Sequence, residues 1–175
     1  GRPLRWFSLH PLLMLLAFFA AASAGIEAKR RGGRVNTLLH GYTMCAALVL
    51  ALGGWYVIYQ QKIMLGKPHN MSWHSLFGLL AIGGYVLGAA GGLTALHPDF
   101  GVARTNLVLR SAHKLSSRAF TGVAFLALAT GWYKLDGVAT TGLLSLALVA
   151  ISWALLRNKA RSGPTYGEVS QFAGV

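Results

Sequence analysis

The stretch that decides the fold is residues 6–26, WFSLHPLLMLLAFFAAASAGI, which contains no charged side chain. A run of about 20 apolar residues is long enough to cross the hydrocarbon core of a bilayer as one helix. The basic segment KRRGGR at residues 29–34 follows it and predicts a short turn, because two glycines lie among the charges. We therefore expect residues 6–26 to form a membrane-spanning helix.

Four more apolar segments of similar length follow. They cover residues 35–59, 73–96, 112–133 and 138–156. The composition agrees with a membrane protein, since 54% of the 175 residues are hydrophobic and only 11% are charged, whereas a soluble domain carries about 25% charge. We predict an all-α transmembrane helix bundle with five visible spans, in one domain over residues 1–162, and a polar tail over 163–175. Since the sequence opens with Gly1 rather than Met, we also expect a targeting segment or a further N-terminal span ahead of it.

Basic residues divide unequally between the two ends of these spans. One end carries Lys29, Arg30, Arg31, Arg34, Arg104, Arg110, Arg157, Lys159 and Arg161, with Lys114 and Arg118 close to it. The other end carries Arg2, Arg5, Lys62, Lys67 and Lys134. By the positive-inside rule the first end faces the cytosol, or the matrix or stroma of an organelle, and the tail lies on that inner side. The formal charge of +12 is thus explained by a lipid bilayer, and we expect no nucleic acid partner.

Four histidines lie near the starts of the first four spans, one in each. They are His10, His40, His74 and His113. Because consecutive spans alternate in direction, His10 and His74 fall toward the outer side and His40 and His113 toward the inner side. Haem iron takes two axial ligands from opposite faces of its ring, and imidazole is a common one. Two pairs at matched depth therefore predict two haems, one above the other across the membrane.

Other interpretations of these histidines are weaker. A single intramembrane histidine is more often a hydrogen-bonded packing residue, and zinc needs about four ligands close together, which two histidines do not supply. Cys45 is the only cysteine and there is no C-x-x-C-H motif, so the haem would be bound without a covalent link. The acids Glu27, Asp99, Asp136 and Glu168 all lie away from the centres of the spans, which argues against a transporter.

Two methionines and a group of glycines accompany the histidines. Met14 and Met44 each follow a histidine by four residues and so share its helix face. We expect them to pack against the haem, although ordinary core packing explains them equally well. The third segment is rich in glycine, which either allows close helix packing or leaves room for the flat macrocycle. These glycines are Gly78, Gly83, Gly84, Gly88, Gly91 and Gly92.

Charged residues and a loop histidine mark candidate substrate sites at the two ends. At the inner end Arg110 lies close to His113, and Arg30, Arg31 and Arg34 precede His40, so an anion could bind there. The alternative is that these charges only set the topology. At the outer end His69 and Lys67 lie a few residues before His74, where a redox partner could bind.

The segments HPLLM around His10, LLHGY around His40, LGKPHNMSWHSLFG around His74 and SAHKLSSRAFTG around His113 resemble the cytochrome b561 family, in particular its small cytochrome b561 domain-containing branch. The resemblance covers essentially the whole chain. It implies a four-helix core with two haem b groups, His10 with His74 and His40 with His113 as ligands, and His69 at the outer substrate site. It also implies electron transfer from ascorbate on the inner side to monodehydroascorbate or ferric iron on the other. The sequence departs from the family in its number of spans and in having arginines where ascorbate-using members carry lysines.

Two functions therefore compete. The first is a transmembrane oxidoreductase driven by ascorbate or a similar small reductant, of the ferrireductase or monodehydroascorbate reductase type. The second is an accessory haem-binding subunit of a larger respiratory or photosynthetic membrane complex, which the short loops and absence of an extramembrane domain would suit. A homodimer is compatible with either, and the sequence does not indicate the organelle.

Overall fold

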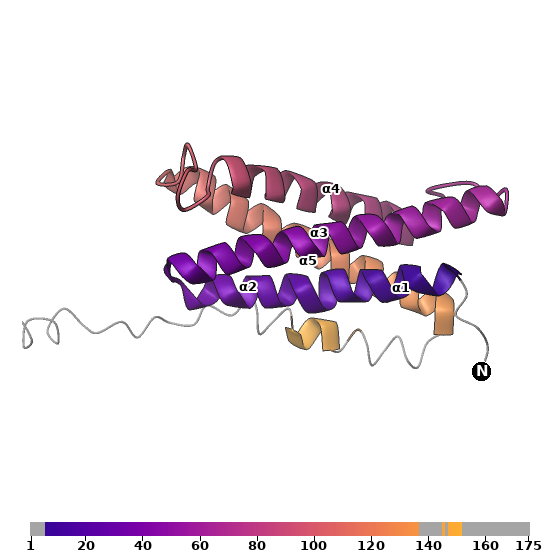
Figure 1. Ribbon diagram of the computed structural model, residues 1–175. Coiled ribbons are helices and arrows are strands. Elements are labelled where there is room, and N and C mark those ends of the chain that lie inside the picture. Colours follow the sequence, from indigo (N-terminus) through magenta and orange to yellow (C-terminus); the bar gives the residue numbers. More distant parts are fainter. Residues whose placement is uncertain (1–5, 137–144, 146, 152–175) are drawn as a thin grey trace, which may run out of the picture.

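The computed structural model describes residues 6–136, 145 and 147–151, and most of this part of the chain is helical. The first rod consists of the 3-10 turn η1 (Trp6–Ser8), helix α1 (Leu9–Met14), the π-helical stretch η2 (Leu15–Ala21) and helix α2 (Ala22–Arg31). These segments run in line beside helix α3 (Figure 1). The predicted span 6–26 is therefore one long helix with a stretch of wider π turns in its middle.

A tight reversal separates the first rod from α3 (Gly33–Met64). Gly32 and Gly33 both have positive φ angles, 75° and 80°. Glycine adopts this region without a steric penalty because it has no Cβ. The two glycines thus allow α3 to start with only Gly32 between it and the end of α2, and to return antiparallel to it.

Helix α4 (Trp73–Thr94) begins after a loop with a defined cap. The backbone N–H of Ser75 donates to the Ser72 hydroxyl, and the N–H of Ser72 donates to the Ser75 hydroxyl over 3.1 Å. This reciprocal capping box satisfies donors that the first turn of a helix leaves unpaired. It fixes the start of α4 one residue ahead of His74.

The connection from α4 to α5 (Leu107–Asp136) lies at the same end of the bundle as the α2–α3 turn (Figure 1). Arg34 donates two hydrogen bonds to Asp99, of 2.7 and 2.9 Å, and so joins the start of α3 to this loop. Arg104 donates to the backbone carbonyl of Asp99 over 2.9 Å. The charged residues of these two connections, which the sequence predicts on one side of the membrane, therefore lie at the same end of the bundle.

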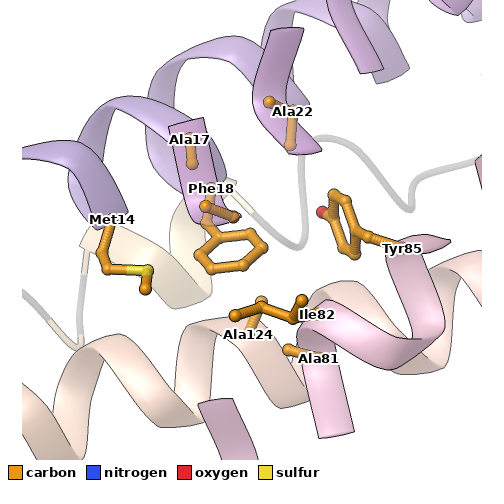
Figure 2. Close-up of a cluster of buried hydrophobic side chains, with 10 residues drawn as sticks. Met14, Ala17, Phe18, Ala22, Ala81, Ile82, Tyr85 and Ala124 are labelled. Carbon is orange, nitrogen blue, oxygen red and sulfur yellow. The ribbon is translucent and has the colours of Figure 1, made fainter. Parts of the chain in front are cut away.

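Small side chains dominate the core between the two ends of the bundle. Phe18 is its largest fully buried side chain and packs edge-on against Tyr85, with ring centroids 5.1 Å apart (Figure 2). Six alanines surround this pair, and alanine allows helix backbones to approach closely. They are Ala17, Ala22, Ala47, Ala51, Ala81 and Ala124.

Glycines of α4 provide a second close contact, with α5. A Cβ at Gly84 would overlap the Phe120 ring, while one at Gly88 would lie 3.9 Å from the Ser117 hydroxyl. Gly92, four residues further on, faces His113. Positions spaced by four lie on one helix face, so this glycine stripe packs against α5, whereas Gly78, Gly83 and Gly91 meet no other described atom within 4 Å.

Three helices in the described part of the chain are long and apolar enough to cross a membrane: Trp6–Arg31, Gly33–Met64 and Trp73–Thr94. They confirm the prediction of an all-α transmembrane bundle. The fourth predicted span, 112–133, lies within α5, a 30-residue helix whose apolar stretch is bounded by Arg118 and Lys134. Of the fifth, 138–156, residues 145 and 147–151 are helical and the rest lies outside the described residues, as do the domain boundary at 162 and the tail.

Candidate functional site

The outer pair of histidines comes together across two helices that are distant in sequence. His10 on α1 and His74 on α4 have ring centroids 6.0 Å apart, with ring planes at 83°. A bond between a first-row metal ion such as zinc and an imidazole nitrogen measures about 2.0–2.1 Å, so two such bonds in line put the nitrogens about 4 Å apart and the ring centroids about 6 Å apart. The separation therefore suits one metal ion between the two rings.

Backbone carbonyls fix which nitrogen of each outer ring carries the proton. Nδ1 of His10 lies 2.8 Å from the carbonyl oxygen of Gly54, and Nδ1 of His74 lies 2.8 Å from that of Ala127. A carbonyl only accepts, so each Nδ1 must donate. Each ring then has an unprotonated Nε2, which is the form that binds a metal. A hydrogen bond of this kind on the far nitrogen is the usual support of a ligating histidine.

In the inner pair, His40 has the same kind of backbone support. Nδ1 of His40 donates to the carbonyl oxygen of Gly25 over 2.9 Å. His113 on α5 lies within electrostatic range of His40, and a Cβ at Gly92 would be 3.7 Å from its ring. The two pairs lie at opposite ends of the bundle, with the alanine-rich core between them.

The donors in each place are imidazoles only. Among the described residues, no group of three or more histidine, cysteine, aspartate or glutamate side chains could hold a metal ion. A bare zinc ion would lack ligands, whereas haem brings four nitrogen ligands of its own and needs only the axial two. In α5 the indole nitrogen of Trp132, the residue after Gly131, is buried and has no hydrogen-bond partner among the described residues. The residues present thus fit haem.

A family model described as eukaryotic cytochrome b561 matches residues 9–136, a segment that contains all four histidines. The chain belongs to the cytochrome b561 family. The family implies b-type haem, which agrees with the imidazole-only donors. It also confirms the resemblance seen in the histidine motifs.

Individual relatives agree with the family assignment. Over 102 residues the chain is 35% identical to a transmembrane reductase, CYB561D2, of Bos taurus and 34% identical to the Homo sapiens protein of the same name. Each alignment covers 53% of this chain and 45% of the relative. The matched region is thus less than half the length of those proteins. Together with the three membrane-capable helices, the family identifies a multi-pass integral membrane protein.

In this b561 bundle Met14 and Met44 lie against the glycines that serve the histidines. Met14 is buried, and its methyl group is 3.2 Å from where a Cβ of Gly54 would be. The sulfur of Met44 lies 3.0 Å from the corresponding point at Gly25. Both methionines therefore pack beside the carbonyls that accept from His10 and His40. Their predicted contact with haem stays a prediction.

Three of the four arginines predicted at the inner substrate site are in ion pairs. Arg30 and Arg31 lie 3.1 and 3.6 Å from the carboxylate of Glu27. Arg34 binds Asp99 in a bidentate pair. Their charge is therefore largely compensated in place. The guanidinium of Arg34, hydrogen-bonded to Asp99, holds the pKa of that carboxyl below its usual value.

Lys29 is an inner cation whose place in the sequence predicts only membrane topology. It lies within electrostatic range of His40, His113 and Arg110, and its ammonium group donates to the Thr37 hydroxyl over 2.8 Å. Lys29 and Arg110 thus create a positive electrostatic potential beside the imidazoles of His40 and His113. The sequence carried a weak signal for this, since a lysine at the end of one helix faces the start of the next across a two-glycine turn.

Of the two residues predicted in the outer loop, Lys67 lines an open cavity and His69 packs against a tyrosine of α3. The ring of His69 lies 4.7 Å from that of Tyr59, which itself lies 5.3 Å from Trp55. Lys67 lines a cavity of about 670 Å³ whose wall also includes Trp6 and Lys62. This cavity lies at the end of the bundle nearer His10 and His74, because Trp6 is four residues ahead of His10.

Proposed function

We propose that this chain transfers electrons across a membrane through two non-covalent haem b groups. His10 and His74 would be the axial ligands of the outer haem, and His40 and His113 those of the inner one. The spacing of 6.0 Å between the nearly perpendicular rings of His10 and His74 carries this proposal. Haem, when bound, supplies iron that changes between the ferric and ferrous states.

The protein's own residues position and insulate these groups. Each hydrogen bond from Nδ1 holds a ring in one tautomer and one orientation, which raises the basicity of the nitrogen that would bind iron. Phe18, Tyr85 and the surrounding alanines fill the space between the two levels and exclude water from it. Met14 and Met44 would pack at the haem edges beside Gly54 and Gly25.

The inner end suits a small anionic reductant. We propose that ascorbate or a similar molecule binds at Lys29 and Arg110, with Arg30, Arg31 and Arg34 adding to the positive field. The proximity of Lys29 to both inner histidines supports this placement. The arginine ion pairs with Glu27 and Asp99 make those three side chains less available for direct contact.

The outer end would serve the electron acceptor. His69 and Lys67 are the proposed acceptor-site residues, and monodehydroascorbate or a ferric chelate is the proposed acceptor. The cavity lined by Lys62 and Lys67 offers two cations to such an anion. The name transmembrane reductase carried by the relatives supports an oxidoreductase rather than a carrier of another kind.

Electron transfer across sealed vesicles tests the proposed function. Full-length, haem-loaded protein is reconstituted into vesicles with ascorbate inside and a ferric chelate outside. We expect ferrous iron to form outside, and His74→Ala or His40→Ala to abolish it. His97→Ala is the control, because His97 lies in the α4–α5 loop, where its ring stacks on Phe100. A rate equal to that of protein-free vesicles would refute a transmembrane reductase and favour an accessory subunit, which should then co-purify with a larger complex.

A further inference from the structure

In each of the two antiparallel helix pairs, both helices carry a histidine that contacts a glycine of the other helix. Between the first rod and α3, His10 donates to Gly54 and His40 donates to Gly25. Between α4 and α5, His74 lies against Gly131, and His113 lies against Gly92. Every proposed ligand thus contacts a glycine of its antiparallel neighbour, through the glycine's carbonyl oxygen in the first pair and beside its Cα in the second.

The spacing along each helix of the second pair matches these contacts. Eighteen residues separate His74 from Gly92, and eighteen separate His113 from Gly131. Eighteen residues make five full turns of an α-helix, so the histidine and the glycine of one helix lie on the same face, about 27 Å apart. The two helices can therefore make both contacts at once only when they pack antiparallel in one register.

The closest of these contacts is at Gly131. A Cβ there would lie 2.6 Å from Cε1 and 2.8 Å from Nδ1 of His74. Real Cβ atoms do not come this close to other heavy atoms, so one of the two groups would have to move. Ala127, one turn earlier on α5, provides the carbonyl that accepts from the same Nδ1. The α5 backbone at residues 127–131 thus contacts the imidazole of His74 at two points. The carbonyl of Ala127 accepts the Nδ1 proton, and the Cα of Gly131 limits how closely the ring can approach α5.

We propose that Gly131 is a positioning residue that sets the plane of the His74 ring relative to His10. The inference rests on the proposed function, in which both rings bind one iron. With a methyl group at 131 the imidazole would have to tilt or withdraw from α5, and both movements change its bond to iron. Gly131 would then control the strength and electronic character of the outer haem site without touching iron itself.

Gly131→Ala tests this, with Gly122→Ala as the matched control on the same helix. A Cβ at Gly122 meets no other described atom within 4 Å. In Gly131→Ala we expect a shift in the low-spin ferric electron paramagnetic resonance signal and in the midpoint potential of one haem only. We also expect that haem to be lost about tenfold faster or more, as for other changes to the support of a metal ligand. If Gly131→Ala matches Gly122→Ala in signal, potential and haem retention, the proposal is wrong.

A second variant keeps the test decisive if Gly131→Ala does not accumulate. In His74→Gly the tethered ring is absent, and free imidazole can be added as the sixth ligand. Without the His74 side chain, the methyl group added at position 131 no longer meets a ring. In the presence of imidazole, His74→Gly/Gly131→Ala should therefore fold and bind haem as well as His74→Gly does. A double variant as defective as Gly131→Ala would show that the methyl group collides with something other than His74. Absence of haem from the unaltered chain would instead refute the proposed function.

Discussion

The imidazoles of His10, His40 and His74 each donate to a backbone carbonyl, and this could not be predicted from the sequence. Residue type and order along the chain suffice to pair four histidines by depth, and the structure brings His10 and His74 to 6.0 Å. A carbonyl acceptor has no residue signature, because every residue carries one. The same limit hid Ala127, whose side chain has no polar atom, as the partner of His74.

The charge of Lys29 should matter to the donor more than that of its neighbours. We expect Lys29→Gln to raise the KM for an anionic reductant about tenfold, because a hydrogen bond to a charged group contributes about 1.5–3 kcal/mol. Lys29→Arg should restore most of the affinity. Steady-state reduction of the haems at varied ascorbate concentrations measures the effect.

Lys114→Gln is the control for the Lys29 variant. Lys114 is exposed on α5, one turn beyond Arg110 and on the same membrane side. The substitution removes the same charge, so any general loss of surface potential would appear in both variants. Equal KM values for the two variants would contradict a specific role for Lys29.

The pair of Arg34 and Asp99 predicts a pH dependence of stability. Since the pKa of Asp99 is lowered by its hydrogen bonds from Arg34, the pair stabilises the fold fully above the ordinary carboxyl pKa of about 3.9. That contribution is lost as the pH falls through the lower pKa of the folded state. Asp99→Asn should therefore melt below the parent protein near neutral pH, by a small margin because the pair is exposed.

Thermal unfolding at several pH values checks this behaviour. The difference between the parent protein and Asp99→Asn should shrink toward acid pH and toward high salt, since screening weakens exposed ion pairs. A difference that stays constant with pH would mean that Asp99 acts through packing or loop geometry rather than charge.

At the level of elements, the helices were predictable but their ends were not. The predicted spans 35–59 and 73–96 are α3, Gly33–Met64, and α4, Trp73–Thr94. Apolar patterns mark the part of a helix that lies in lipid, whereas backbone hydrogen bonds carry the helix onward into polar residues. For this reason α3 continues through Gln60, Gln61 and Lys62, while the positive φ of Gly32 could be expected from the paired glycines.

The π-helical stretch η2 explains an asymmetry in the first helix pair. Fifteen residues separate His10 from Gly25 on the first rod, but fourteen separate Gly54 from His40 on α3. Wider π turns accommodate an additional residue within a helix. This stretch therefore brings His10 and Gly25 into register with their partners on α3. Uncharged, alanine-rich sequence gave no sign of it.

Packing of α4 on α5 depends on the glycine stripe. Gly84→Ala should destabilise the bundle by about 1–3 kcal/mol, the usual cost of overpacking a filled interior, because the added methyl group would overlap the Phe120 ring. The neighbouring Gly83→Ala should be nearly neutral, since its Cβ meets no other described atom within 4 Å. Denaturant titration of the detergent-solubilised proteins measures both. If Gly84→Ala and Gly83→Ala were equally stable, α4 and α5 would be able to move apart around Gly84 at little cost, which would contradict close packing there.

At the scale of the whole molecule, two imidazole levels lie at the ends of one bundle, with an apolar core between them. About 27 Å along α4 separates His74 from Gly92, which is close to the roughly 30 Å thickness of a hydrocarbon core. The basic segments at residues 29–34 and 97–110 lie at one end, which is the end that the positive-inside rule assigns to the inner side. This polarity gives the proposed electron path a donor end and an acceptor end.

The number of b haems per chain tests the central claim most directly. Haem is extracted from the purified full chain and counted, beside the oxidised-minus-reduced visible spectrum, in the parent protein and in His74→Ala and His40→Ala. Two haems in the parent and one in each variant are predicted, with His10→Ala matching His74→Ala because both remove a ligand of the same iron. No haem in the parent protein, or an undiminished count in both variants, would contradict the account.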